Sequence, residues 1–357
     1  MFELTNDQRK CFALVPINEK WECVEAKPSP YDDFKTYVFI QENTIVKCVL
    51  SGDNYYSEYE MNEQVSADRK FLLPKTAKGK PVLLSSGNIL KRKGFGMCLT
   101  YKKKHIGIFN LNTESYYFSN EYLEDEICSI SDFSDWVKKW CIETTDADQA
   151  DVLNFSRQKR RHIKFQEGDV FRFKIGRRLY GYGRIILDFV KMSKQKEPFW
   201  DILMCRPLIC SVYHIVTERA DVSIDEIKNL KSLPSTVMAD NSIYYGEYEI
   251  IGNIPVSSDE DYPVMYGKSI CMGDNAVCYQ CGKVYRRIEN GNELYAGFRN
   301  NATHFELNFN LPILKQCIID GSNQAYWENY HSRFVEEDLR NPKHIKKLQD
   351  IKMQFQL

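Results

Sequence analysis

The chain has 357 residues, which is too long for one typical hydrophobic core and suits two domains of ordinary size. Its 48 basic and 49 acidic residues nearly cancel, so the whole-chain charge indicates neither a nucleic-acid-binding nor a membrane-surface protein. No apolar run approaches the ~18 residues of a membrane span, and the N-terminus lacks the pattern of a secretory signal. We therefore expect a cytoplasmic protein without a membrane partner, whose twelve cysteines are thiols rather than disulfides.

The first 150 residues predict a β-rich domain, whose role the sequence does not indicate. A short helix is expected over 5–15, because Thr5 and Gln8 form a capping-box pattern. A second helix is expected over 131–141, with one apolar face formed by Phe133, Trp136, Val137 and Trp140. Aromatic and β-branched segments predict strands at 36–41, 44–50, 54–60, 96–101, 105–111 and 114–119.

The stretch from 143 to 162 is polar, lacks a hydrophobic period and changes from acidic to basic, which favours a domain boundary. We place a linker at 151–162 and a second β-rich domain with a C-terminal helix at 163–357. Asn290-Gly291 indicates a hairpin between its two flanking segments. Strands are expected at 170–175, 184–190, 199–205, 211–216, 244–252 and 276–281, and short helices after Ser223 and from Pro342. The expected fold class is α+β, mainly antiparallel β-sheet in two domains with a few short helices.

The segment GDVFRFKIGRRLYGYGRIILDF (168–189) contains a Gly-x-Gly pair that could form either a phosphate-binding loop or a bend in a sheet. A phosphate-binding loop requires the glycines to lead into a helix N-terminus. Here Gly181 and Gly183 are followed by Arg-Ile-Ile-Leu, which is typical of a strand. Glycines within a strand pattern mark bulges or sharp bends, so we predict a bend and no anion site.

These residues also resemble a known family. The order GDVFRF, a basic turn, YGYGRII and then PFWDIL is similar to the opening of the immunity protein 26 family of bacterial polymorphic toxin systems, a family also labelled with a phosphotriesterase. The resemblance extends from 165 to about 300. It implies a protein that neutralises a cognate toxin by binding it, without a cofactor. The residues that carry it in a structural role are Gly168, Asp169, Phe171, Gly181, Gly183 and Trp200.

Tyr180, Tyr182 and Arg184 are the candidates for contact with the toxin. Tyr, Trp and Arg dominate the energetics of protein interfaces, and these three lie next to the predicted bend. A role in the hydrophobic core is the alternative for any of the tyrosines, and it is the reading we favour for Trp200.

Two other functions remain open. A phosphotriesterase-like hydrolase would need a metal or nucleophile site, but no two of the six histidines are spaced as metal ligands. Cys278 and Cys281 have the spacing of a zinc ligand pair, yet no second pair exists and a strand would direct them to opposite sides. We therefore predict no catalytic residues and no metal, with these two cysteines as weak candidates.

A nucleic-acid-binding module is the second alternative. Residues 66–104 contain eleven Lys or Arg and one acid, whereas 114–151 contain eleven acids and two Lys. Aromatic residues are sparse in the basic segment, whereas a surface on which bases stack requires several of them. We expect the two blocks to compensate each other or to face a charged protein partner, and nucleic acid to be no partner.

Overall fold

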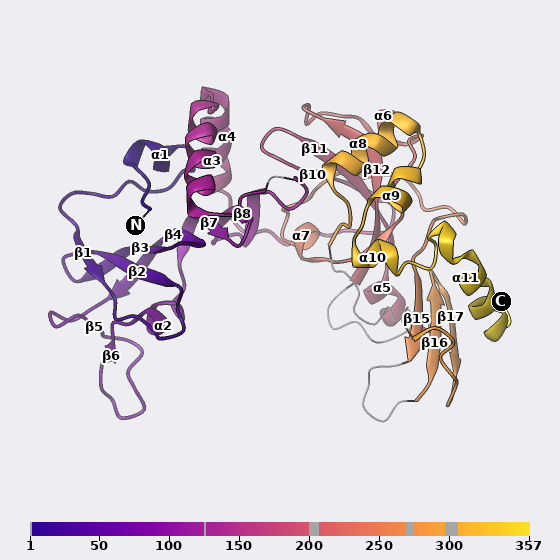
Figure 1. Ribbon diagram of the computed structural model, residues 1–357, viewed down its shortest axis with the longest axis horizontal. Coiled ribbons are helices and arrows are strands. Elements are labelled where there is room, and N and C mark those ends of the chain that lie inside the picture. The colour runs from indigo at the N-terminus through magenta and orange to yellow at the C-terminus, as the bar shows by residue number, and fades with distance from the viewer. Residues whose placement is uncertain (1, 125, 200–206, 269–274, 297–305) are drawn as a thin grey trace. The chain divides into compact units, whose positions relative to one another are not determined.

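The structure is a computed structural model that describes residues 2–124, 126–199, 207–268, 275–296 and 306–357 (Figure 1). It divides into two compact units. Unit 1 comprises Met1–Glu121 and Asp125–Arg161, and unit 2 comprises Tyr122–Glu124 and His162–Leu357. Both units are built on antiparallel sheets with short helices, so the α+β class predicted from the sequence is confirmed. Among the described residues, no helix has the length and apolar character needed to cross a bilayer.

Unit 1 contains a seven-stranded antiparallel sheet of order β1-β2-β3-β4-β7-β8-β9. Its hairpins form where aromatic and β-branched runs are separated by short polar turns. Each of the six strands predicted in this half corresponds to one observed strand. The seven strands of the sheet, of which β1 was not predicted, are β1 (Glu22–Glu25), β2 (Phe34–Gln41), β3 (Thr44–Gly52), β4 (Tyr55–Gln64), β7 (Phe95–Lys102), β8 (His105–Asn110) and β9 (Ser115–Ser119).

Both faces of this sheet are covered. On one face α1 (Asn6–Lys10) and α3 (Ile130–Ile142) enclose an aromatic cluster in which Phe133 stacks on Tyr101. The other face packs against α2 (Ser86–Ile89) and the small hairpin β5 (Lys70–Phe71)–β6 (Val82–Leu83). The Thr5 capping box is present, but α1 ends at Lys10 and is shorter than predicted.

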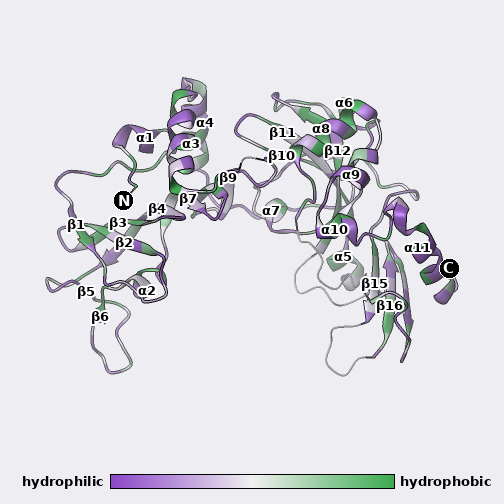
Figure 2. Cartoon of the chain, in the orientation of Figure 1, coloured by the Kyte–Doolittle hydropathy of each residue, from purple (hydrophilic) through white to green (hydrophobic). Residues whose placement is uncertain are grey.

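The polar stretch around the expected domain boundary contains a helix. Residues Asp146–Ser156 form α4, which Thr145 caps through Asp148. Its few apolar residues follow no helical period, which is why the sequence pattern did not indicate it. Figure 2 shows α3 and α4 with hydrophilic and hydrophobic residues mixed along their length.

A group of buried charges lies beneath α1. Glu58 and Lys47 are both 0% exposed, with 2.5 Å between Oε1 and Nζ. Arg9 Nε donates to the same oxygen at 2.8 Å, and Tyr56 OH donates to Oε2 at 2.6 Å. Burial alone would raise the pKa of Glu58, but Lys47 and Arg9 hold it below its usual value. Because every polar atom named here has a partner, the cluster fixes α1 in one position on the sheet.

Unit 2 contains a five-stranded sheet of order β13-β12-β11-β10-β14 and a three-stranded sheet of order β15-β16-β17. Its strands are β10 (Asp169–Lys174), β11 (Tyr180–Asp188), β12 (Pro207–Thr217), β13 (Thr236–Ala239), β14 (Glu249–Asn253), β15 (Val264–Lys268), β16 (Val277–Cys281) and β17 (Val284–Ile288). Short helices connect them: α5 (Phe189–Lys194), α6 (Ile224–Ile227) and α7 (Asn241–Tyr244).

The C-terminal segment completes the core of unit 2. Helices α8 (Leu311–Asp320) and α9 (Gln324–Asn329) cover one face of the five-stranded sheet, where Leu314 and Tyr326 pack with Phe171 and Phe173. The segment continues through α10 (Arg333–Glu336), η2 (Pro342–His344) and α11 (Ile345–Gln354), which packs on the three-stranded sheet through Ile351. The last helix predicted from Pro342 is therefore present.

The hairpin predicted at Asn290-Gly291 is wrong. β17 pairs with β16 through the turn at Gly282-Lys283, and residues 292–296 form no strand. Those residues pack against α11 instead, where Tyr295 OH donates to Asp350 at 2.5 Å. The predicted strand at 199–205 lies almost entirely outside the described residues.

Glu58→Gln tests the buried cluster. Since the amide cannot balance Lys47 and Arg9, we expect a loss of about 3–5 kcal/mol in the free energy of unfolding, measured by urea denaturation. The lowered pKa of Glu58 means that its contribution is present above its ordinary pKa near 4.5 and is lost as the pH falls below that value. The acid-induced decline should therefore be shallower in the variant. Asp7→Asn, which removes the exposed pair with Lys10, is the control and should change the free energy of unfolding little. Equal stability of Glu58→Gln and the unaltered chain would contradict the interpretation.

Candidate functional site

The Gly-x-Gly pair lies in the middle of β11, directly opposite two phenylalanines of β10. Phe171 pairs with Gly183 and Phe173 with Gly181. A methyl group on Gly183 would lie 2.4 Å from Cζ of Phe171, and one on Gly181 would lie 2.6 Å from Cζ of Phe173. The glycines are therefore required because the two aromatic rings lie across the backbone at these positions.

The strand pairing is also irregular at this point. The pairing of β11 with β12 shifts register between Gly181 and Gly183, and β11 then continues to Asp188 before α5 begins at Phe189. No helix starts after Gly183, so no helix N-terminus is available there to bind an anion. The prediction that the glycines lie in a strand and not in a phosphate-binding loop is confirmed.

Gly168 and Asp169 fix the entry to β10. Gly168 has φ +91°, and a Cβ there would lie 2.8 Å from the carbonyl oxygen of Ile254. Asp169 accepts from the amide of Gln166 and from the side chain of Asn253, both at 2.8 Å. These residues join β10 to the end of β14 and act structurally, as do the buried Phe171, Gly181 and Gly183.

The three candidate contact residues form a row on one face of β11. Tyr182 at the centre of this row is fully buried, and its hydroxyl contacts Thr217 Oγ1 at 3.1 Å and donates to the carbonyl of Arg219 at 2.9 Å. The segment around α6 covers it. Tyr182 therefore belongs to the core and presents no surface to a partner, which corrects the expectation from the sequence.

Arg184 lies at the inner end of the row and is 12% exposed. It forms an ion pair with Glu260, which is 11% exposed, and it donates to the carbonyl of Pro255 at 3.4 Å. Glu260 in turn accepts from the amide of Ser257 at 2.9 Å. Arg184 thus holds the loop 255–262 against the sheet.

Tyr180 lies at the outer end of the row and is partly exposed. The guanidinium of Arg172 is 5.2 Å from its ring centroid and Lys174 Nζ is 5.9 Å from it, so two cations face the ring. Arg172 also forms an ion pair with the exposed Glu249 of β14. Of the candidates that the structure describes, Tyr180 is therefore the one on an accessible, charged surface. Trp200 lies outside the described residues.

The two cysteines of the candidate zinc pair lie on opposite sides of β16. Cys278 faces the cluster around Phe189 and Met192, whereas Cys281 faces the cluster around Leu339 and Ile351 on the opposite side of β16. Burial raises the pKa of the Cys281 thiol, which disfavours the thiolate that a metal binds. Within the described ranges, no group of three or more His, Cys, Asp or Glu is placed to hold a metal ion.

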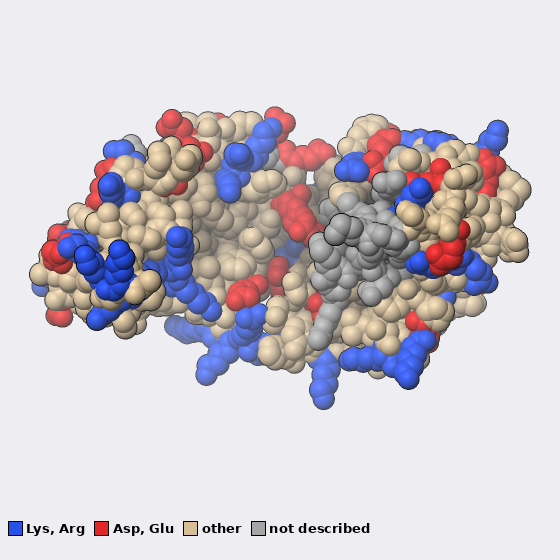
Figure 3. Space-filling view, turned by 90° about the horizontal axis from the view of Figure 1, so that it is seen from below, with Lys and Arg blue, Asp and Glu red and all other residues tan. Residues whose placement is uncertain are grey.

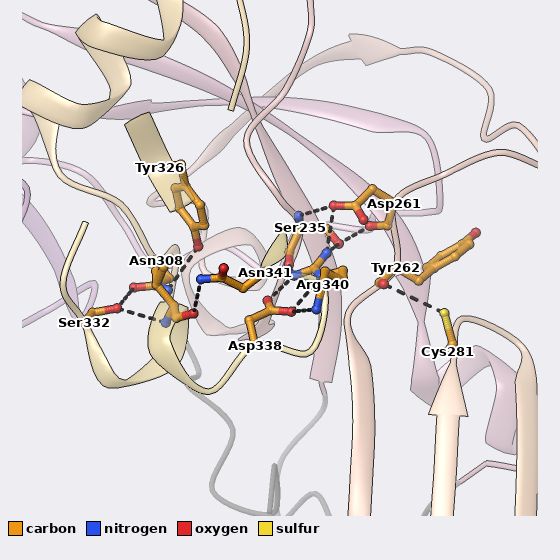
Figure 4. A network of polar contacts seen from close by, with 11 residues as sticks. Ser235, Asp261, Tyr262, Cys281, Asn308, Tyr326, Ser332, Asp338, Arg340 and Asn341 are labelled. Atoms are coloured by element: carbon orange, nitrogen blue, oxygen red, sulfur yellow. Dashed lines mark hydrogen bonds and ion pairs between the residues drawn. The ribbon is translucent and has the colours of Figure 1, made fainter. Parts of the chain in front are cut away.

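A polar network near the C-terminus, centred on the buried Arg340, was not predicted by any sequence pattern (Figure 4). Arg340 forms ion pairs with Asp338 and Asp261, both at 2.7 Å, and donates to the carbonyl of Ser235 at 2.7 Å. Burial alone would lower the pKa of this guanidinium, but the two carboxylates hold it above its usual value. The network ties the segment after α10 to the loops before β13 and β15, because the three groups come from distant parts of the chain.

The geometry of unit 2 defines a β-rich α+β protein whose central hairpin β10–β11 carries a partly exposed aromatic–cationic group around Tyr180. Residues 166–276 match the family model of immunity protein 26, which confirms the resemblance predicted from the sequence for this segment. No curated protein and no solved structure matches the chain. The match ends before α8, although α8 and α9 complete the same core.

Gly183→Ala tests the aromatic–glycine packing. The added methyl would overlap both Phe171 and the carbonyl oxygen of Ser211, so we expect a loss of about 1–3 kcal/mol in the free energy of unfolding. Gly176→Ala in the same hairpin is the control, because its nearest atom would be 3.9 Å away. Adding Phe171→Leu to Gly183→Ala should cost less than the sum of the two single changes, and strict additivity would contradict direct contact.

Metal analysis of the purified protein tests the thiol arrangement. Because Cys278 and Cys281 face opposite sides of a strand, we expect no stoichiometric zinc or other transition metal by mass spectrometry. A stoichiometric metal that is lost in Cys278→Ser would overturn this expectation and would favour the hydrolase.

Proposed function

We propose that this protein is an immunity factor that binds a cognate toxin of a polymorphic toxin system and neutralises it by non-covalent capture. The observation that carries the proposal is the match of residues 166–276 to immunity protein 26. A protein of this kind requires a preformed surface, because binding is tighter when less conformational freedom is lost. The hairpin β10–β11, with its fixed pairing and packed glycines, offers such a surface.

The contact surface that we propose is centred on Tyr180, with Arg172, Lys174 and Glu249 around it. Tyrosine and arginine provide contact area at low entropic cost and are enriched at interface hot spots. The ring of Tyr180 is anchored on one side by the two cations and by the apolar cluster around Val170 and Tyr213. Arg184 has a positioning role in this proposal, since it holds the loop 255–262 beneath the same face.

The hydrolase alternative has no specific observation in its favour among the described residues, and neither does the nucleic-acid-binding module in unit 2. We therefore propose a binding protein of the cytoplasm, in which unit 2 recognises the toxin. The domain boundaries that we propose follow the sequence: an N-terminal domain at 1–150, a linker at 151–162 and an immunity-like domain at 163–357.

Co-expression tests the proposal. The toxin encoded beside this gene should arrest growth when expressed alone and should not do so together with this protein, as read from colony counts under induction. Equal killing with and without the protein would refute the proposal.

Tyr180→Ala tests the contact surface. Removing the ring should weaken binding of the purified toxin at least tenfold by isothermal titration calorimetry, because truncating a hot-spot side chain costs about 2 kcal/mol or more and ~1.4 kcal/mol is tenfold. Tyr31→Ala is the matched control, since Tyr31 is an exposed tyrosine of unit 1. If both variants have the same thermal unfolding midpoint, a loss of affinity in Tyr180→Ala is due to a lost contact and not to a destabilised fold. An unchanged affinity in Tyr180→Ala would place the contact elsewhere.

A further inference from the structure

The outer surface of unit 1 around the β5–β6 hairpin combines lysines with exposed apolar side chains. We call it the hairpin surface and define it by ten exposed residues: Leu72, Leu73, Lys75, Lys78, Lys80, Leu83, Leu90, Lys91, Lys93 and Phe95. Figure 3, seen from the side of this hairpin, shows Lys and Arg side chains projecting from unit 1.

The apolar part of the hairpin surface is unusually concentrated. Among the described residues, seventeen large hydrophobic side chains are exposed, and five of them lie between 72 and 95. Leu73 is the most exposed of the five, at 68%. Since contiguous exposed apolar groups on soluble proteins mark interaction sites, this concentration calls for a partner.

The fold of unit 1 does not need these apolar side chains. Phe71, Leu84 and Ile89 from the same segment are buried and fill the core on this face of the sheet. Leu72 and Leu83 are the neighbours of buried residues along the strands and therefore point outward. Exposure of Leu72 and Leu83 thus follows from the strand alternation of the hairpin.

The hairpin is held in place. Arg92 donates to the carbonyl of Leu73, lies over the ring of Phe71 at 4.1 Å and forms an ion pair with Glu63 at 3.1 Å. Asn88 Nδ2 donates to the carbonyl of Leu83 at 3.0 Å. These contacts join the hairpin to α2 and to the segment before β7, so the elements that carry the ten residues are held together.

The five lysines of the hairpin surface carry an uncompensated positive charge. In the part of the chain that the structure describes, none of the five forms an ion pair or a side-chain hydrogen bond, and the nearby acids Glu22, Asp68 and Glu63 are paired with Arg69, Lys70 and Arg92. Helix α3, with two acids and two lysines, lies on the opposite face of the sheet. Within the described residues, the ion pair Lys104–Glu126, at 3.9 Å, joins the two charge blocks beyond the far end of β7. The expected mutual compensation therefore does not reach the hairpin surface.

We propose that the hairpin surface binds an anionic lipid bilayer, with the lysines at the phosphate headgroups and the leucines and Phe95 at the boundary with the acyl chains. Lysine clusters and exposed Leu and Phe are the combination that peripheral membrane surfaces use. The long lysine stems can lie along the apolar layer while their ammonium groups stay at the headgroups. The sequence-based expectation of no membrane partner rested on the balanced charge of the whole chain, which conceals this local excess.

Other partners fit the composition less well. Protein interfaces are enriched in Arg and aromatic residues and depleted in Lys, whereas the arginine here, Arg92, is already engaged within the fold. Single-stranded nucleic acid requires several aromatic rings for stacking, and Phe95 is the one aromatic member of the hairpin surface. This proposal is independent of the toxin-binding role of unit 2.

Sedimentation of the full chain with lipid vesicles tests the proposal. We expect binding to vesicles of equal parts phosphatidylglycerol and phosphatidylcholine, weaker binding as salt is added, and no binding to phosphatidylcholine alone. The variant Lys75→Gln/Lys78→Gln/Lys80→Gln should bind at least tenfold more weakly, and Leu73→Ser/Leu90→Ser should bind at least fivefold more weakly.

Two matched controls separate this surface from general charge and hydrophobicity. Lys102→Gln/Lys103→Gln/Lys104→Gln removes the same charge at the opposite end of β7, about 25 Å away at the rise of a strand, and should bind within twofold of the unaltered chain. Ile142→Ser removes a side chain that is 84% exposed at the end of α3 and should bind equally well. Since all substituted side chains are exposed, the thermal unfolding midpoints should agree.

Three results would overturn the proposal. The unaltered chain could fail to sediment with the anionic vesicles, or the two lysine triplets could weaken binding equally. The third is that the serine variant binds normally while a soluble polyanion such as heparin abolishes vesicle binding, which would assign the surface to an anionic macromolecule instead of a bilayer.

Discussion

The packing of two phenylalanine rings across two glycines organises unit 2. Phe171 and Phe173 extend over the backbone of β11 at Gly183 and Gly181, and any larger residue at those positions would collide with the rings. The rings can then reach the core that α8 and α9 close from the other side. The pairing of β11 with β12 shifts register between the glycines, and Tyr180 packs at the partly exposed edge of the cluster that buries Tyr182. A sequence element that resembles an anion-binding loop therefore has a structural role, because its glycines allow two aromatic rings to pack against the strand backbone.

Two arginines link the five-stranded sheet to the rest of unit 2 through ion pairs. Arg184 on β11 pairs with Glu260, and Arg340 from the C-terminal segment pairs with the next residue, Asp261. The adjacent acids thus connect the five-stranded sheet and the C-terminal segment to the strand that begins the three-stranded sheet. The Arg184–Glu260 pair is 12% and 11% exposed. Such a pair contributes little net stability over apolar packing, but it penalises any arrangement that leaves one partner unpaired. Here that penalty selects one path for the loop 255–262.

Local sequence patterns predicted the features that depend on residues close together in the chain. Alternation and aromatic content indicated the strands of unit 1 and the β10–β11 pair, and capping boxes indicated the starts of α1 and α6. The burial of Tyr182 could not be predicted, because the segment that covers it is separated from it by more than thirty residues and makes its hydrogen bonds only in the folded chain. The same holds for Arg340, whose partners are far apart in sequence. The false hairpin at Asn290-Gly291 shows a correct turn signal overridden by tertiary packing, since Tyr295 is held by α11.

The dependence of the unit 2 core on α8 and α9 has a consequence for the order of events during synthesis. β12 ends at Thr217 and α8 begins at Leu311, so at about 5–20 residues per second roughly 5–20 s separate their emergence from the ribosome. Through that interval the inner face of the central sheet, with Phe171, Phe173 and Leu208, has no helices to cover it. Unit 1 completes its own core earlier along the chain. Nascent unit 2 is accordingly a natural client for chaperones that shield apolar sheets, and slow translation downstream of β12 would prolong its exposure to aggregation.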